Sequence, residues 1–229
     1  MRAGLYGAKH CNRRSQGLWI AFFGPDGVGK SAVIERLPDE LAGAFSGCAR
    51  FHFRPRFGGR EAHAEPVIAP HAQRPRGSLI SYCKLTYWLL DCWLGYWFLV
   101  RPALRRSGLV IFDRYLPDLL VDPVRYRLPV SARKFAFWLV KLAPHPGVWV
   151  LLDAPAETVQ QRKPEVSPAE SRRQRLAYLK MFESLRNALV IDADCPLEEV
   201  TRNVAAKILS MPHQDSSDHG RLSHCRLPI

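Results

Sequence analysis

At residues 24–31 the chain reads Gly24-Pro25-Asp26-Gly27-Val28-Gly29-Lys30-Ser31, which fits the pattern G-x-x-x-x-G-K-[ST]. Glycines in such a loop let successive backbone N–H groups curl around a phosphate anion. The apolar run from Leu18 to Phe23 predicts a buried strand before the loop, and apolar residues at helical spacing predict a helix over 31–45 after it. An ordinary glycine-rich turn would not need this order of strand, loop and helix, so we interpret the stretch as a phosphate-binding P-loop.

The motif predicts how a nucleoside triphosphate would be held. Lys30 would reach the β- and γ-phosphates, and the Ser31 hydroxyl would ligate Mg²⁺. The positive end of the following helix dipole would face the same phosphates. The sequence therefore predicts ATP and Mg²⁺ as cofactors, with the donor site completed by the other residues of the loop: Gly24, Asp26, Gly27, Val28, Gly29 and Ala32.

Composition indicates a globular protein with an anionic partner. The chain has 229 residues, 47% of them apolar, and a net charge of +12. The length suits one α/β domain, which we place at 18–210, between a loose basic tail over 1–17 and a disordered tail over 211–229. No nucleic-acid-binding motif accompanies the charge, so we assign the basic residues to phosphate binding and expect no nucleic-acid partner.

Six scattered cysteines without a C-x-x-C pair fit free thiols in a reducing compartment. The first 17 residues lack the apolar core of a signal peptide. We therefore expect a cytoplasmic protein.

Strands and helices alternate along the chain. After the first strand, the runs that read as strands are 50–54, 108–113, 148–153 and 188–192, and helical patterns separate them, the last over 197–209. This alternation predicts an α/β fold, a three-layer sandwich with a five-stranded parallel sheet covered by helices on both faces.

The second strand leads into a loop with three arginines and two glycines, Arg54-Pro55-Arg56-Phe57-Gly58-Gly59-Arg60. Ligands of open parallel sheets bind beyond the carboxyl ends of the strands. Because a guanidinium can bind phosphate oxygens through two hydrogen bonds, this loop is a candidate clamp for a second, phosphate-bearing substrate. The alternative is a merely solvated basic loop.

Residues 79–100 are apolar and rich in aromatic residues, and they are long enough to span a membrane. Lys84 and Asp91 oppose a span, because a charge near the bilayer centre is costly. We therefore expect a helix buried in the core or at a subunit contact, with a homodimer through 79–100 as a hypothesis. The aromatic residues of a second amphipathic helix, over 131–142, are expected in the core.

Two apolar runs end in an acid, Asp113 and Asp153. Either carboxylate fits the acid that organises Mg²⁺ and water near a P-loop, and the pattern alone does not choose between them.

Farther along, a helix over 156–162 stops at Lys163-Pro164, and a helix over 168–185 carries Arg172, Arg173 and Arg175. This arginine-rich, proline-hinged segment, about 154–175, predicts a closing lid. A solvated helix face paired with glutamates is the alternative.

These features together resemble the thymidylate kinase family of P-loop nucleoside monophosphate kinases. The similarity covers roughly residues 18–209. It rests on the P-loop with its acid Asp26, on Arg54-Pro55 with Gly58-Gly59, and on the signature Asp113-Arg114-Tyr115. The fourth signal is Leu152-Asp153-Ala154-Pro155 followed by Arg162.

The resemblance implies transfer of the ATP γ-phosphoryl group to an acceptor phosphate. By this similarity, Lys30, Asp113, Arg114 and Arg162 are catalytic, and Ser31 and Asp113 serve the metal. Arg54 and Arg114 would bind the acceptor phosphate, Asp26 an acceptor sugar hydroxyl, and Arg162 would lie over the adenine or the phosphates.

Two departures leave the acceptor open. Phe23 stands where the family commonly has Glu, and the family's thymine-recognition segment is not visible over 116–126. We expect a kinase for which dTMP is the first acceptor to test. The alternatives are a P-loop kinase of a sugar or another surface-polysaccharide-related acceptor, shaped by Arg56, Arg60 and Arg125, and an inactive nucleotide-binding protein.

Overall fold

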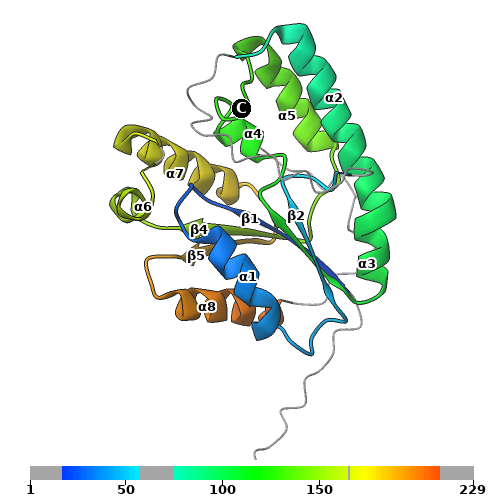
Figure 1. Cartoon of the computed structure of the whole chain (residues 1–229), viewed down its shortest axis with the longest axis vertical. Helices are drawn as coiled ribbons and strands as arrows, with labels where there is room; N and C mark the ends of the chain where they lie inside the picture. The colour runs from blue at the N-terminus through cyan, green and yellow to red at the C-terminus, as the bar shows by residue number, and fades with distance from the viewer. Residues whose placement is uncertain (1–16, 57–74, 165, 212–229) are drawn as a thin grey trace, which may run out of the picture.

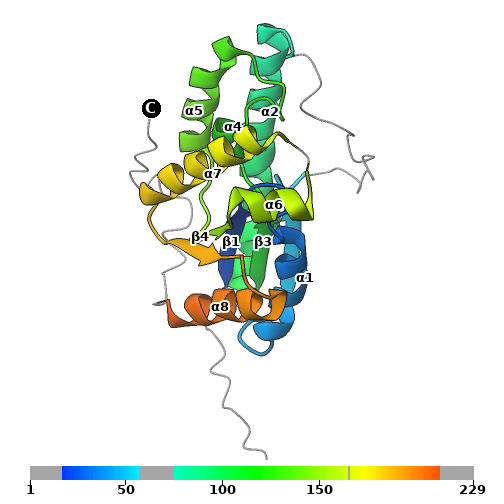
Figure 2. The ribbon, with the colours of Figure 1, turned by 90° about the vertical axis from the view of Figure 1, so that its left-hand side faces the viewer.

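A computed structural model describes residues 17–56, 75–164 and 166–211 of the chain. Five parallel strands form one sheet in the order β2-β3-β1-β4-β5, with helices on both faces (Figures 1 and 2). The strands are β1 (Leu18–Phe23), β2 (Cys48–His52), β3 (Leu109–Asp113), β4 (Val148–Asp153) and β5 (Ala188–Asp192). This architecture confirms the predicted three-layer α/β fold.

Strand β1 lies at the centre of the sheet, and all six of its residues are buried. Its side chains alternate between two hydrophobic cores. Leu18, Ile20 and Phe22 pack with α1 and α8 on one face, whereas Trp19, Ala21 and Phe23 pack with α2, α5 and α7 on the other. A parallel strand covered on both faces is expected to be apolar throughout, as this one is.

The helices connect the strands and form the outer layers. They are α1 (Lys30–Glu40), α2 (Ser78–Gly95), α3 (Arg101–Arg105), α4 (Asp118–Val121), α5 (Arg133–Leu142), α6 (Ala156–Arg162), α7 (Pro168–Glu183) and α8 (Leu197–Ser210). A π-helical turn, η2 (Tyr96–Val100), joins α2 to α3, and a 3₁₀ turn, η3 (Val130–Ala132), precedes α5.

Several predicted boundaries need correction. Helix α1 ends at Glu40, not near residue 45, because Gly43 adopts a left-handed φ of 87° that turns the chain away. Strand β2 begins and ends two residues earlier than predicted. The short helix α4 was not predicted at all. The predicted tails lie outside the described residues apart from Gly17 and Met211, and so does the part of the arginine loop from Phe57 to Arg60.

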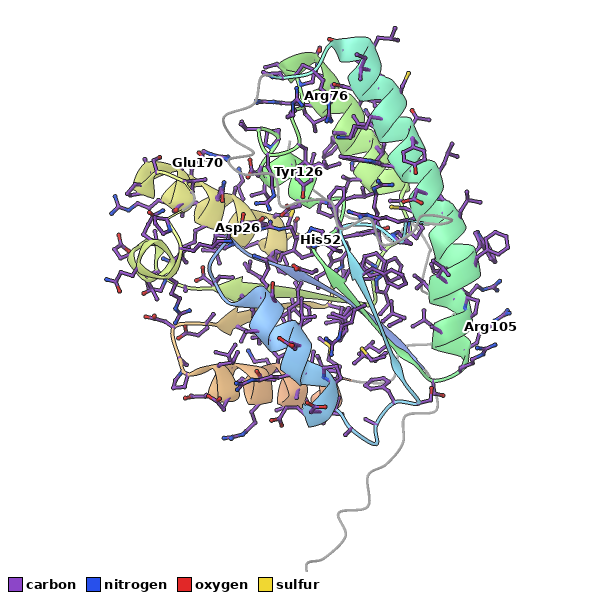
Figure 3. All side chains as sticks on the ribbon, viewed as in Figure 1. Asp26, His52, Arg76, Arg105, Tyr126 and Glu170 are labelled. Carbon is purple, nitrogen blue, oxygen red and sulfur yellow. The ribbon has the colours of Figure 1, made fainter. Side chains whose placement is uncertain are left out.

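One face of the apolar stretch 79–100 meets the core as expected, and the other face is exposed in the single chain, where a subunit contact stays a prediction. Leu85, Trp88 and Cys92 face the core, but a second row of large apolar side chains faces outward (Figure 3). That row includes Leu79, Ile80, Tyr87, Leu90, Leu94, Trp97 and Phe98. In the part of the chain that the structure describes, no helix is long and apolar enough to cross a membrane.

The aromatic residues of α5 are also less buried than predicted. Trp138 is 61% exposed and Phe135 37%, so the core contacts of this helix are made by Ala136, Leu139 and Val140. These three small or aliphatic residues occupy the inward positions of the helix, which places the large rings on the outside.

Candidate active site

The P-loop runs from the end of β1 to the start of α1, and its glycines are required by its geometry. Gly24, Gly27 and Gly29 have φ angles of 140°, 87° and 103°, which L-amino acids rarely adopt. A Cβ at position 24 would lie 2.6 Å from the Leu152 carbonyl oxygen, and one at position 27 would lie 2.8 Å from Lys163 Cβ. The loop therefore packs tightly against β4 and against the residue that follows α6.

Lys30 is buried and folds back over the loop. Its Nζ donates hydrogen bonds to the carbonyl oxygens of Gly24, at 2.8 Å, and of Pro25, at 2.7 Å. Burial and, second, the positive charge of Arg114 lower the pKa of Lys30 to about 8, against the opposing effect of nearby carboxylates. Val28 is also buried, whereas Ser31 is exposed in the first turn of α1 and Ala32 is partly exposed behind it.

Asp113 ends β3 beside the P-loop, and one of its oxygens is unsatisfied. Its Oδ1 is buried and has no hydrogen-bond partner among the residues that the structure describes, while its Oδ2 lies 3.5 Å from His52 Nδ1. Burial alone would raise the pKa of Asp113. The hydrogen bond from His52 and the charge of Lys30 outweigh burial, and the pKa lies below its usual range.

Asp153 ends β4 on the other side of β1, but its carboxylate is fully engaged. Arg175 of α7 binds it in a bidentate pair, with Nε 2.7 Å from Oδ1 and Nη2 2.8 Å from Oδ2. The two acids that the sequence could not distinguish therefore have different surroundings.

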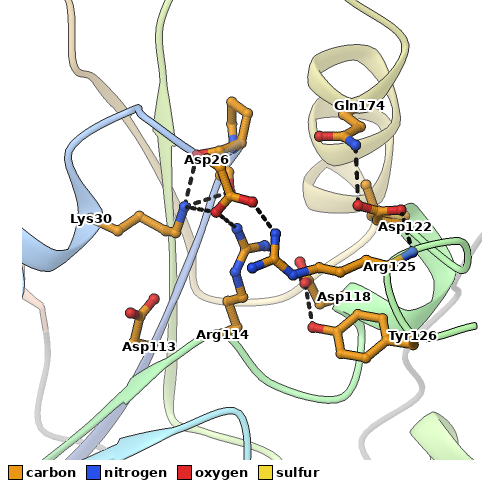
Figure 4. Close-up of polar contacts among 12 residues, drawn as sticks. Asp26, Lys30, Asp113, Arg114, Asp118, Asp122, Arg125, Tyr126 and Gln174 are labelled. Carbon is orange, nitrogen blue, oxygen red and sulfur yellow. Dashed lines mark hydrogen bonds and ion pairs between the residues drawn. The ribbon is translucent and has the colours of Figure 1, made fainter. Parts of the chain in front are cut away.

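Asp26 of the P-loop joins two arginines from distant parts of the chain. Its Oδ1 accepts a hydrogen bond from Arg114 Nη2 and its Oδ2 accepts one from Arg125 Nη1 (Figure 4). Arg114 also donates to Asp118 Oδ2 at 2.8 Å and to the Tyr178 hydroxyl at 3.1 Å. Arg114 has a left-handed φ of 66°, an uncommon backbone state that directs its guanidinium into this cluster.

Asp118 is the fully buried anchor of the cluster. It accepts hydrogen bonds from the hydroxyls of Tyr126, at 2.7 Å, and Tyr178 in addition to that from Arg114. Burial alone would lower the pKa of Arg114, but the nearby carboxylates, Asp118 first, raise that pKa well above its usual value. Sequence reasoning missed Asp118 and Tyr178. The spacing of four between Arg114 and Asp118 was the available signal.

Helix α7 is held to the segment that follows α4. Asp122 accepts hydrogen bonds from the Arg125 backbone N–H and from Gln174 Nε2, both at 3.1 Å. Sequence reasoning named Arg125 only in an alternative pocket, yet its guanidinium faces the P-loop acid Asp26.

Arg54 lies at the same edge of the sheet but joins a different set of side chains. Its Nη1 donates to Asp91 Oδ2 at 2.7 Å, and its guanidinium lies 5.2 Å from the ring centre of Tyr87 and 5.7 Å from that of Trp88. The Arg56 N–H donates to the same Asp91 oxygen at 3.2 Å. Asp91, which the sequence analysis used only as an argument against a membrane span, thus fixes the start of the arginine loop.

The arginines of the predicted lid have partners within the protein. Arg162 Nη1 donates to the Ala193 carbonyl oxygen at 3.0 Å, so this residue lies against the loop between β5 and α8. Arg172 pairs with Glu157 at 2.7 Å, and Arg173 pairs with Glu170. In the described residues, no group of three or more His, Cys, Asp or Glu side chains could hold a metal ion.

A P-loop after the first strand of a five-stranded parallel sheet, with an acid at the end of the adjacent strand and a basic segment over β4, defines a P-loop kinase.

No protein-family model matches the chain. It is 28% identical over 204 residues to a thymidylate kinase of Leifsonia xyli, covering 84% of this chain and 94% of that protein. It is 28% identical over 207 residues to a thymidylate kinase of Caulobacter vibrioides, covering 83% and 95%. A thymidylate kinase of Xanthomonas oryzae is 27% identical over 206 residues. These relatives support a divergent, thymidylate kinase-like protein.

Proposed function

We propose that the chain transfers the γ-phosphoryl group of ATP to the phosphate of a small acceptor, and that dTMP is the first acceptor to test. The observation that carries the proposal is the pair of Lys30 and Asp113 beside the P-loop. One is a buried cation on the loop, and the other is a carboxylate with a buried, unpartnered oxygen at the end of the adjacent strand. A carboxylate oxygen left without a partner fits an acid that receives hydrogen bonds from the waters of a bound Mg²⁺.

In the proposed reaction an oxygen of the acceptor phosphate attacks the γ-phosphorus, and the bond from that phosphorus to the β–γ bridging oxygen breaks. Lys30 stabilises the negative charge that develops on the leaving ADP. Asp113 and the Ser31 hydroxyl would hold the metal and its waters, and bound Mg²⁺ would neutralise charge on the β- and γ-oxygens. Little covalent chemistry is asked of the protein, so catalysis consists of positioning and electrostatic stabilisation.

The acceptor phosphate would bind between Arg114 and Arg54, with Asp26 contacting an acceptor hydroxyl and Arg162 contributing from the lid. In the structure Asp26 binds Arg114 and Arg125 directly. An arriving phosphate would take over part of the bonding of these two guanidinium groups, which frees Asp26 oxygens for a hydroxyl.

The test is ADP release by the purified protein with Mg-ATP across dTMP, other nucleoside monophosphates and sugar phosphates. Lys30→Ala should abolish stimulated release, because the developing charge on ADP loses its cation. The matched control is Lys134→Ala, at an exposed lysine of α5, which should keep the wild-type rate. Stimulation that survives in Lys30→Ala would refute the P-loop assignment, and stimulation only by sugar phosphates would exclude dTMP as the acceptor.

We also propose a homodimer formed through the outer face of α2 and η2. The exposed residues 80, 83, 87, 90, 94 and 97 recur at alternating spacings of three and four, which makes a continuous apolar seam of the kind that pairs two helices. A second copy of the same seam is its natural partner. Light scattering at micromolar concentration should give twice the monomer mass, and Leu94→Glu with Trp97→Glu should give a monomer. A monomeric wild-type protein would refute the dimer.

A further inference from the structure

Four cations from separate segments converge beside α2. Arg54 follows β2, Arg76 precedes α2, Lys84 lies on α2, and Arg127 follows α4. The Arg76 N–H donates to the Arg127 carbonyl oxygen at 3.1 Å, which ties two of these segments together. We call these four residues the α2 cation cluster.

Aromatic rings support two members of the cluster. Lys84 Nζ lies 4.4 Å from the ring centre of Trp88, and the Arg54 guanidinium lies 5.7 Å from the centre of the same indole. Asp91 also binds Arg54, by accepting a hydrogen bond from its Nη1 at 2.7 Å. Lys84 is thus positioned by an aromatic ring, and Arg54 by rings and one carboxylate.

The nearby charges that act on Lys84 from the described residues are those of three arginines, all positive. Burial, followed by repulsion from Arg76, Arg54 and Arg127, lowers the pKa of Lys84 to about 8. Lys84, Arg76 and Arg127 are each partly buried, so water screens their mutual repulsion less than it would on an open surface. An anion bound among these cations would attract each of them and so offset their mutual repulsion.

Arg54 belongs to both the cluster and the proposed phosphate site, whereas Lys84 is connected to Arg114 only through a group of aromatic rings. Phe53 stacks on Tyr126 at 4.7 Å, and Trp88 lies edge-on to both rings, 5.0 Å from Phe53 and 6.0 Å from Tyr126. The Tyr126 hydroxyl bonds Asp118, the partner of Arg114. Figure 3 labels Tyr126 together with Arg76 of the cluster and Asp26 of the P-loop.

We propose that the α2 cation cluster binds a second anionic group of the acceptor, a phosphate or a carboxylate, while the first phosphate occupies the Arg114 side of the aromatic rings. The inference rests on the proposed function and narrows its acceptor to a small molecule with two anionic groups. The planar guanidinium groups of Arg76 and Arg127 suit either anion, because both present paired oxygens to a bidentate donor.

Two matched pairs of probes test the inference. One pair is dTMP and 5-carboxy-2′-deoxyuridine 5′-monophosphate, and the other is glucose 1-phosphate and glucuronic acid 1-phosphate. Within each pair the second member adds a carboxylate, and the two pairs separate a nucleotide acceptor from a sugar acceptor. Dissociation constants are measured by calorimetry without ATP, so that turnover plays no part.

In the pair that matches the true acceptor class, nucleotide or sugar, the carboxylated member should bind the wild-type protein about tenfold more tightly than the uncarboxylated member. A factor of this size is expected for one charge-assisted contact. Lys84→Met keeps the aliphatic stem on Trp88 but removes the charge, and should abolish the advantage without changing affinity for the uncarboxylated member. Arg76→Gln should act in the same way, and Lys134→Met should change nothing. Equal affinities within both pairs, or an advantage that survives in both cluster variants, would overturn the inference.

The pH dependence gives a readout that a structural role for Lys84 would not move. In the free protein Lys84 loses its proton as the pH rises through about 8. The advantage of the carboxylated probe should therefore shrink between pH 7 and pH 9.5, and binding at the upper end should take up protons. An advantage that is constant across this range would contradict the role of Lys84.

The outcomes separate this inference from the proposed function. If probe selectivity follows the cluster variants but no acceptor stimulates ADP release, the second anion site stands and the kinase proposal fails. If ADP release is stimulated and Lys30→Ala abolishes it, while both members of each pair bind equally, the kinase proposal stands and the second anion site is refuted.

Discussion

Strands β3 and β4 flank the central strand β1 and end in the same way, an apolar run followed by an aspartate, yet the two aspartates differ. Asp113 keeps a buried oxygen without a partner beside Lys30, whereas both oxygens of Asp153 are bound by Arg175. The difference begins with the neighbouring strands. The register partner of Asp113 is His52 of β2, and that of Asp153 is Asp192 of β5.

This comparison shows that the chemistry of a strand-end acid is decided by side chains from elsewhere in the chain. Asp153 stands beside a second carboxylate, and two like charges on adjacent strands need a cation between them. Arg175 of α7 supplies it, and the negative charges around Arg175, that of Asp153 first, raise its pKa. Asp113 stands beside His52 and not beside a second carboxylate, and its Oδ1 has no hydrogen-bond partner among the described residues.

Among the aspartates compared, Asp118 is the most buried, and it accepts hydrogen bonds from several side chains. Asp118→Ala should lower the free energy of unfolding by about 3–5 kcal/mol, because the buried Arg114 guanidinium loses its partner. Urea unfolding measures the loss. Asp39→Ala, at an exposed position of α1, should stay within about 0.5 kcal/mol of the wild type. A similarly small loss for Asp118→Ala would mean that Arg114 does not depend on this carboxylate.

Asp113→Asn tests the functional half of the comparison. It should lower kcat for acceptor-dependent ADP release by about 10²–10³-fold, the scale of removing one preorganised electrostatic contact in an active site. The amide keeps the size of the side chain but loses the charge that would orient the metal's waters. Steady-state kinetics measures the effect, and circular dichroism checks the fold. A rate near that of the wild type would remove Asp113 from the mechanism.

Asp153→Asn should have a smaller effect on the same rate, less than about tenfold, because its carboxylate is already occupied by Arg175. Both variants are measured in one series with the same acceptor. If Asp153→Asn proves the more damaging change, the acid of the metal site has been assigned to the wrong strand.

The smallest effect concerns the stabilisation that the Asp153–Arg175 pair provides. A double-mutant cycle with Asp153→Asn and Arg175→Gln should give a coupling of about 0.5–1 kcal/mol, since both side chains are partly exposed and the pair is screened by salt. Arg172 and Glu157 form the matched control, because they are paired at the same distance on the open surface. The Arg172–Glu157 pair should show no measurable coupling. A coupling as large as that of the Asp153–Arg175 pair would mean that partial burial does not strengthen the Asp153–Arg175 interaction.

The sequence was sufficient for the sheet and for the donor loop. Both depend on short patterns, the apolar runs and the spacing of Gly24, Gly29 and Lys30, and local backbone sterics enforce them. It was not sufficient for the environment of each acid. Arg175 and Asp153 are 22 residues apart and Arg125 and Asp26 are 99 apart, and no local pattern records such pairs.

The stretch 79–100 shows a second limit of the sequence. Its apolar residues cover the helix nearly all round, and composition cannot say which of two apolar faces meets the core. Trp88 and Cys92 are buried, while Leu90 and Leu94 are exposed. Only the packing of α2 against α5 and against neighbouring aromatic rings separates the two faces.

The central place of β1 also has a consequence for how the protein is made. Its hydrogen-bonding neighbours are β3 on one side and β4 on the other, and β4 begins at Val148, well over a hundred residues after β1 has left the ribosome. Synthesis of that length takes on the order of ten seconds. Until β3 is made, neither edge of this apolar strand has a neighbour, and the edge that β4 will cover stays unpaired throughout. The nascent chain therefore depends on delayed collapse or on a chaperone to reach its fold.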